Sequence, residues 1–173
     1  MLHTLVILVE DKPGVLNRVA SLFRRRAYNI ESLTVGHTDT EGLSRMTVTV
    51  EGDEQHIERL TSYLYKLVNV IQIEGLSDKH MVSRDLALIK VSTVSEKRAE
   101  IFQMVEVFRA RVIDVTSSSL IIEITGDGSK IDGFVDVLKP LGIIEMVRTG
   151  AVAMERGSES LVNTEALFEA VPA

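Results

Sequence analysis

The apolar and polar positions of the chain follow two periods, and together they predict one order of elements. Residues 2–10 predict a strand buried on both faces, because Leu5 to Val9 are all apolar. A helix to about Arg26 follows, with apolar residues three and four positions apart. Strands over 28–36 and 46–50, a helix from Ile57 to Leu67 and a strand over 68–74 complete the order β-α-β-β-α-β. The apolar phase shifts inside 28–36, which predicts a bulge.

The second half of the chain predicts the same order again. It contains a strand over 86–91, a helix over 101–108, short strands over 112–115 and 120–125, a helix over 131–138, and a segment over 143–154 that ends in a strand. Gly52-Asp53 and Gly126-Asp127 each precede a helix, and Asp53 is a good N-cap residue. The β-α-β-β-α-β order is the ferredoxin-like arrangement. We therefore expect an α+β fold with two ferredoxin-like domains, each an antiparallel sheet with helices on one face.

The predicted domain boundaries follow from this repeat. Residues 1–76 form the first domain, 77–83 a linker, 84–154 the second domain, and 155–173 a flexible acidic tail. Because 5–9 and 86–89 are apolar on both faces, the second faces or the edges of the sheets should meet another domain or another chain. Packing of the two domains on each other within one chain is the alternative.

Composition narrows the classes of function. The 173 residues are 45% hydrophobic and 25% charged, as in folded proteins. Cysteine is absent, which excludes disulfides, thiolate metal sites and a cysteine nucleophile. A net charge of −6 and 5% aromatic residues argue against a nucleic-acid partner. No apolar run predicts a membrane span or a signal peptide, so we expect no membrane partner and a cytoplasmic location.

Candidate catalytic and metal-binding patterns are weak. The four histidines lack the spacing of metal ligands, so no metal site is predicted. The segment 126–130 is glycine-rich but fits neither phosphate-loop pattern, and a turn followed by a helix N-cap at Ser129 is favoured. No catalytic residue can be named. The sequence therefore favours a binding or regulatory protein over an enzyme that acts alone.

The most informative local feature is the turn that joins the first strand to the first helix, Asp11-Lys12-Pro13-Gly14-Val15-Leu16. Free N–H groups and the positive end of the helix favour an anion there, and Gly14 allows a close approach. Asp11 would accept from an ammonium group, so the turn suits an amino acid. Asn29 would add hydrogen bonds. An ordinary strand-to-helix turn is the alternative.

The same turn in this fold resembles the Asp-x-Pro-Gly-x-Leu signature of ACT domains, which are amino-acid-sensing modules. Residues 22–35, Leu-Phe-Arg-Arg-Arg-Ala-Tyr-Asn-Ile-Glu-Ser-Leu-Thr-Val, and 43–47, Leu-Ser-Arg-Met-Thr, resemble the small regulatory subunit of acetolactate synthase, also called acetohydroxyacid synthase. Residues 111–116 and 148–150 are similar to the C-terminal domain of that family. The resemblance covers roughly residues 2–156.

This resemblance implies a regulatory role without catalysis. Members bind and activate a thiamine-diphosphate-dependent catalytic (large) subunit and confer feedback inhibition by valine in branched-chain amino acid biosynthesis. Thiamine diphosphate, FAD and Mg are then expected on the catalytic subunit, with no cofactor on this chain. ACT domains of the family pair into a homodimer. The alternative is a free-standing ACT sensor that regulates a different enzyme.

The resemblance also implies an effector site between two chains. Its residues are Asp11, Lys12, Pro13, Gly14, Val15 and Leu16 of one chain and Asn29 and Ile30 of the other. Asp11 and Asn29 would take the polar ends of valine, Gly14 and Val15 would offer N–H groups, and Leu16 and Ile30 would line the apolar part. Ala27 stands where the family usually has Gly. A left-handed Ala costs about 1 kcal/mol, so an altered turn is expected there. Position 11 varies between Asn and Asp in the family, and the charge of Asp11 is expected to change valine affinity.

Overall fold

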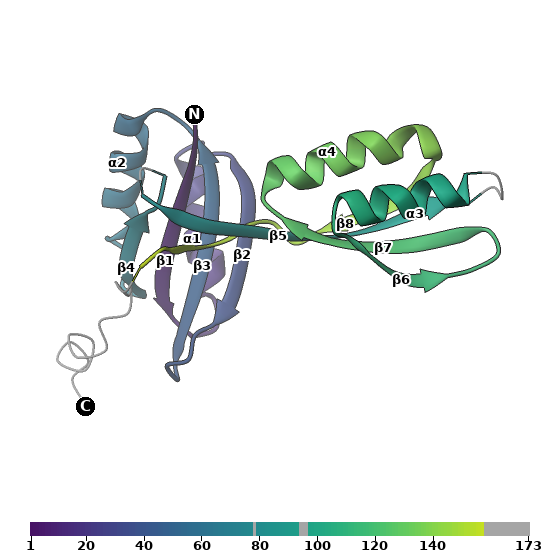
Figure 1. The fold of residues 1–173 in the computed structure, drawn as a ribbon. Helices are drawn as coiled ribbons and strands as arrows, with labels where there is room; N and C mark the ends of the chain where they lie inside the picture. The colour runs from purple at the N-terminus through teal and green to yellow at the C-terminus, as the bar shows by residue number, and fades with distance from the viewer. Residues whose placement is uncertain (78, 94–96, 158–173) are drawn as a thin grey trace. The chain divides into compact units, whose positions relative to one another are not determined.

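The computed structural model describes residues 1–77, 79–93 and 97–157, and the chain divides into two compact units. Unit 1 holds Met1–Val82 together with the segment from Ala153, and unit 2 holds Ser83–Val152. Both units are antiparallel sheets with two helices, drawn in Figure 1. The predicted α+β fold with two ferredoxin-like units is confirmed.

Unit 1 has the predicted order of elements. They are β1 (Leu2–Glu10), α1 (Val15–Arg25), β2 (Ile30–His37), β3 (Leu43–Glu51), α2 (Glu54–Leu64) and β4 (Val70–Gly75). The sheet order is β2-β3-β1-β4, so β2 and β4 are its edges. The register of β2 on β3 shifts between Ile30 and Ser32, which confirms the predicted bulge.

The core of unit 1 lies between one face of this sheet and the two helices. Alternate residues of β1, Leu5, Ile7 and Val9, are at most 1% exposed and face the helices, as the period of two requires. Phe23 of α1 and Leu60 of α2 complete the same cluster. Each helix therefore presents one apolar face to the sheet.

The opposite face of β1 is covered in part by a later segment of the chain. Val6 forms a small buried cluster with Leu76 and with Ala153 of β9 (Val152–Glu155). Arg45 Nη2 donates to the carbonyl of Ala153 at 2.6 Å. Lys79 bridges Glu74 and Glu155, its Nζ lying 2.8 Å from Glu155 Oε2. The apolar run over 5–9 thus has partners on both faces within its own unit.

Unit 2 repeats the arrangement. Its elements are β5 (Met81–Ser92), α3 (Arg98–Val107), β6 (Arg111–Val115), β7 (Ser119–Gly126), α4 (Gly128–Leu138), a 3-10 turn (Lys139–Leu141) and β8 (Ile143–Arg148). The sheet order is β6-β7-β5-β8, and β9 also pairs with β5. Ile89, Ile122 and Phe134 are fully buried in its core.

Several predicted boundaries differ from the structure. The expected linker 77–83 is partly strand, because β5 begins at Met81 and runs longer than the predicted 86–91. The segment 143–154 is two strands, interrupted where Gly150 has φ 85°. Ala153 belongs to unit 1, and Glu155 ends β9 instead of starting the tail. Residues 158–173 of the predicted tail lie outside the described residues.

The turn after α1 keeps its left-handed geometry despite Ala27. This residue has φ 56°, and the N–H of Tyr28 donates to the carbonyl of Phe23 at 3.0 Å. That bond spans five residues, as in a Schellman cap. The expectation of an altered turn was therefore wrong, because the surrounding hydrogen bonds hold Ala in the conformation that Gly adopts more easily.

Candidate functional site

The Asp11–Gly14 turn is ordered by the backbone and exposed to solvent. The N–H of Asp11 donates to the carbonyl of Gly42 at 2.7 Å, and the N–H of Lys12 donates to that of Glu10 at 3.0 Å. Gly14 has φ 85°, and a Cβ built there meets nothing within 4 Å. The backbone conformation, and not lack of space, therefore favours glycine at this position.

The N-terminus of α1 has no side-chain cap. Gly14 is its N-cap residue, and the first turn holds no acidic residue. By contrast, Asp53 caps α2 by accepting from the N–H of His56 at 2.7 Å, as predicted, and Asp127 caps α4 by accepting from the N–H of Lys130 at 2.8 Å. The positive end of α1 therefore has no side-chain cap, unlike those of α2 and α4.

A polar network anchors the turn from two other elements. Arg18 Nη1 donates to Asn69 Oδ1 at 2.6 Å, and Asn69 Nδ2 donates to Glu10 Oε2. The ammonium of Lys12 lies 3.1 Å from Glu10. The hydrogen bond from Asn69, followed by that from Lys12, holds the pKa of Glu10 below its usual value. Sequence reasoning missed Asn69, because its partner Glu10 is 59 residues away along the chain.

The carboxylate of Asp11 faces the end of β2. His37 Nδ1 lies 3.3 Å from Asp11 Oδ2, and the Asp11 side chain remains 46% exposed. Lys12 is held by Glu10, and Pro13 is exposed in the turn. Val15 is buried in the core and its N–H donates to the carbonyl of Lys12 at 3.3 Å, whereas Leu16 is 45% exposed. The Leu16 side chain is therefore accessible for the apolar contact predicted for it.

Asn29 and Ile30 lie at the other end of the same sheet. Ile30 pairs with Val50 on β3, which pairs with His3 near the start of β1. The turn follows Glu10, which ends β1 and lies seven residues beyond His3. At about 3.3 Å per residue, His3 and Glu10 are about 23 Å apart along the strand. Asn29 is exposed and donates from Nδ2 to Glu31 Oε1. One chain therefore brings residues 11–16 together but keeps them apart from 29–30.

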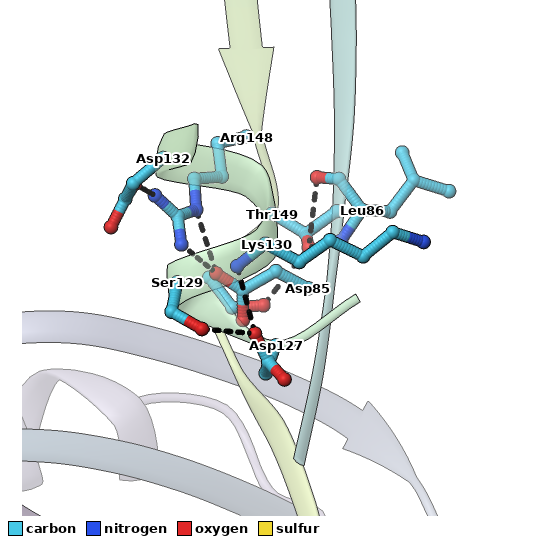
Figure 2. A network of polar contacts seen from close by, with 9 residues as sticks. Asp85, Leu86, Asp127, Ser129, Lys130, Asp132, Arg148 and Thr149 are labelled. Carbon is cyan, nitrogen blue, oxygen red and sulfur yellow. Dashed lines mark hydrogen bonds and ion pairs between the residues drawn. The ribbon is translucent and has the colours of Figure 1, made fainter. Parts of the chain in front are cut away.

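The glycine-rich segment of unit 2 belongs to an internal polar network (Figure 2). Asp127 caps α4 and accepts from Ser129 Oγ at 2.7 Å, so the N-cap is Asp127 and not the predicted Ser129. Lys130 Nζ donates to the carbonyl of Thr125 at 2.9 Å. No phosphate loop is formed, because the polar groups of this segment already bond to one another.

Arg148 is the centre of a second part of this network. Its Nε donates to Asp85 Oδ2 at 2.6 Å and its Nη1 to Asp132 Oδ1 at 2.8 Å. Asp85 is buried, at 7% exposure, so removing Arg148 would leave a buried carboxylate without its ion-pair partner. These contacts join β5, α4 and β8 within unit 2. Across 1–77, 79–93 and 97–157, no three His, Asp or Glu side chains gather as metal ligands would, and no helix is long and apolar enough to cross a membrane.

Comparison with known proteins matches both units to one family. The model for the small subunit of acetolactate synthase matches residues 84–157, and the AHAS small subunit-like ACT domain matches residues 5–72. The chain belongs to the acetolactate synthase small subunit family. The ACT match spans the Asp11–Leu16 turn and Asn29–Ile30, so all the predicted site residues lie in the ACT domain.

Individual relatives of this family cover nearly the whole chain. A probable acetolactate synthase small subunit from Archaeoglobus fulgidus is 50% identical over 159 residues, 92% of this chain and 99% of its own length. The small subunit from Mycobacterium bovis is 48% identical and covers 92% of this chain and 95% of its own. The crystal structure of the Thermotoga maritima small subunit has a TM-score of 0.86 at 44% identity, with 92% and 99% coverage.

Proposed function

We propose that the chain is the regulatory subunit that binds and activates the thiamine-diphosphate-dependent catalytic subunit of acetolactate synthase and confers feedback inhibition by valine. Family membership and the ACT domain support this role. In this proposal thiamine diphosphate, FAD and Mg belong to the catalytic subunit, and this chain takes part in branched-chain amino acid synthesis through its partner.

The observation that supports a valine site between two chains is that residues 11–16 and residues 29–30 lie at opposite ends of the sheet in one chain. β2 is an edge strand, paired on one side with β3 in the described part of the chain. If two copies pair their β2 edges antiparallel over the full strand, Ile30 of one copy lies opposite His37 of the other. His37 contacts Asp11, so Asn29 of the second copy reaches the turn. A homodimer thereby forms two equivalent sites, each from both chains.

The chemistry of the joined halves suits a small apolar amino acid. The N-terminus of α1 binds the carboxylate of valine through the N–H of Gly14 and through that of Val15, which would share its 3.3 Å bond to the carbonyl of Lys12 with the ligand. The carboxylate of Asp11 accepts from the ammonium group, and Asn29 of the second copy adds hydrogen bonds. Leu16 and the second copy's Ile30 contact the isopropyl group. Lys12 serves the turn by its ion pair with Glu10.

Valine regulates by binding one state of the complex more tightly than the other. A coupling free energy of about 1–3 kcal/mol corresponds to a roughly 5–150-fold difference in the affinity of valine for the two states. Because the ligand spans two chains, tight binding requires the dimer. Valine therefore favours the state in which the two β2 edges are held in register.

Reconstitution tests the proposal. Acetolactate formation from pyruvate is followed with the catalytic subunit alone, with this chain added, and with valine titrated in. Activation that valine reverses is the expected result. Activation without valine sensitivity would contradict the assigned effector, and no activation would contradict the assigned partner and favour a free-standing sensor.

A further inference from the structure

A basic groove runs between α1 and α2 on the helical side of unit 1. Its volume is about 340 Å³, and its lining includes the cations Arg18, Arg25, Arg26 and Lys66 but no carboxylate. The chain as a whole carries a net charge of −6. The groove is therefore positively charged although the chain as a whole is negatively charged.

Some cations of the chain pair with carboxylates, but among the described residues the four that line the groove do not. Within residues 1–77, 79–93 and 97–157, none of the four forms an ion pair, whereas Lys79, Arg111 and Arg148 all do. The helix dipole accounts for Arg25 in the last turn of α1. Arg18, in the N-terminal half of the helix, is held by Asn69, to whose Oδ1 its Nη1 donates at 2.6 Å.

The floor of the basic groove is apolar and aromatic. Leu22 and Leu67 line it together with Tyr63. The guanidinium carbon of Arg26 lies 3.9 Å from the centre of the Tyr63 ring, and Lys66 Nζ lies 5.4 Å from it. Stacking on the ring holds the Arg26 fork in a fixed direction, which lowers the entropy lost when it binds a carboxylate.

The length of the cationic row indicates the kind of ligand. Arg18 and Arg25 are seven residues apart on one helix, or about 10.5 Å along its axis. Carboxylates spaced along a polypeptide match a row of this length, and an apolar side chain between them would fit over Leu22 and Leu67.

We infer that the basic groove is the surface on which an acidic segment of the catalytic subunit docks. The inference rests on the proposed function, which supplies the partner. Charge complementarity identifies the segment as one that carries Asp or Glu side chains around an apolar residue. Because the groove lies between α1 and α2, this contact is separate from the β2 edge, and it adjoins the turn that would bind valine only through Arg18 and its bond to Asn69.

A pair of matched double variants tests this surface. Arg25→Glu/Lys66→Glu reverses two cations of the groove, one at the last residue of α1 and one two residues beyond the end of α2. Arg24→Glu/Arg59→Glu makes the same change of charge on the same two helices, at positions that do not line the groove. Affinity for the purified catalytic subunit is measured by calorimetry at low and high salt, with thermal midpoints to verify folding.

The groove variant is expected to bind the catalytic subunit at least about tenfold more weakly at low salt, because like charges then face each other across the contact. The difference should shrink at high salt. Lys66→Glu alone should fall between this variant and the wild type. The control variant should bind within about twofold of the wild type, since exposed charges outside the contact act weakly.

Other results would overturn the inference. If the groove variant and the wild type bind equally and both activate the enzyme, the groove is not the docking surface. The proposed function would be unaffected by that result. Failure of the wild-type chain to bind the catalytic subunit removes both. If deletion of residues 158–173 tightens binding tenfold and abolishes the effect of the groove variant, the acidic end of this chain occupies the groove in place of the partner.

Discussion

Ala27 and Arg109 adopt the same left-handed conformation at equivalent places in the two units. Their φ angles are 56° and 52°, and each lies two residues beyond the end of the first helix of its unit. The N–H that follows each of them donates five residues back, from Tyr28 to Phe23 and from Ala110 to Val105. The same C-cap therefore aims the chain from the first helix into the edge strand of both units.

Replacing Ala27 by Gly should stabilise unit 1. A left-handed Ala is strained by about 1 kcal/mol relative to Gly, and this exceeds the entropy that Gly adds to the unfolded chain. We expect Ala27→Gly to raise the free energy of unfolding by up to about 1 kcal/mol, measured by urea denaturation.

The control for this substitution is the same chemical change in the middle of α1. Ala20→Gly should lower the free energy of unfolding by about 1 kcal/mol, because Gly is a poor helix former. A loss of stability in both variants would show that the φ of Ala27 carries no strain.

Gly14→Asp should close the N-terminus of α1. A carboxylate at position 14 lies beside the first-turn N–H groups, although its left-handed backbone differs from the extended backbone from which Asp53 and Asp127 cap α2 and α4. It would then compete with the carboxylate of valine and repel it. We expect valine binding to weaken at least about tenfold by calorimetry on this chain.

Gly14→Ala separates charge from backbone strain at the same position. It adds a Cβ that meets nothing within 4 Å, but it strains the φ of 85°. It should weaken valine binding clearly less than Gly14→Asp. Equal losses in the two variants would argue against an open helix end as the carboxylate site.

Mixed dimers test whether the valine site is shared between chains. Asp11→Ala and Asn29→Ala should each abolish valine binding in a dimer of identical chains. When the two variants are mixed in equal amounts and re-associated, about half of the dimers contain one chain of each kind. In such a mixed dimer, one of the two valine sites has both Asp11 and Asn29. About a quarter of all valine sites should therefore return in the mixture, as the symmetry of the dimer requires. No recovery of binding would show that each site needs Asp11 and Asn29 from the same chain, which contradicts a site shared between chains.

Arg148 should matter more to the buried Asp85 than to the exposed Asp132. Arg148→Gln leaves the Asp85 carboxylate buried without its partner and should cost about 3 kcal/mol of unfolding free energy. Adding Asp85→Asn should recover much of that loss, measured as a double-mutant cycle in urea. Asp132→Asn, at a side chain 66% exposed, should cost about 0–1 kcal/mol. Additive effects at positions 85 and 148 would contradict the pairing.

Asp127 should make the stability of unit 2 depend on pH. Hydrogen bonds from Ser129 Oγ and then from the N–H of Lys130 hold the pKa of Asp127 below its ordinary 3.8. A lowered pKa in the folded state stabilises the fold above 3.8, and this contribution is lost as the pH falls through the folded-state value.

The matched variant for this pH dependence is Asp127→Asn, which retains a capping oxygen but does not titrate. The wild type should have the higher urea midpoint at neutral pH, and the two midpoints should converge as the pH falls below 3.8. A constant difference across that range would assign the effect to the shape of the side chain and not to its charge.

The sequence by itself determined the features that depend on local chemistry. Apolar periods of two and about 3.6 determine where strands and helices form, and they predicted both β-α-β-β-α-β orders. Gly14 in the first turn and the caps before α2 and α4 depend on residues that are neighbours along the chain. The family resemblance also arises from continuous segments such as 22–35.

Only the tertiary structure decided how distant residues meet. Sheet register places Asn29 and Asp11 at opposite ends of the sheet in one chain, which no local pattern contains. The bonds of Asn69 to Glu10 and of Arg45 to Ala153 join residues 59 and 108 positions apart. Long-range packing of this kind depends on which strands pair and in which register, so it follows from the whole fold and not from any single segment.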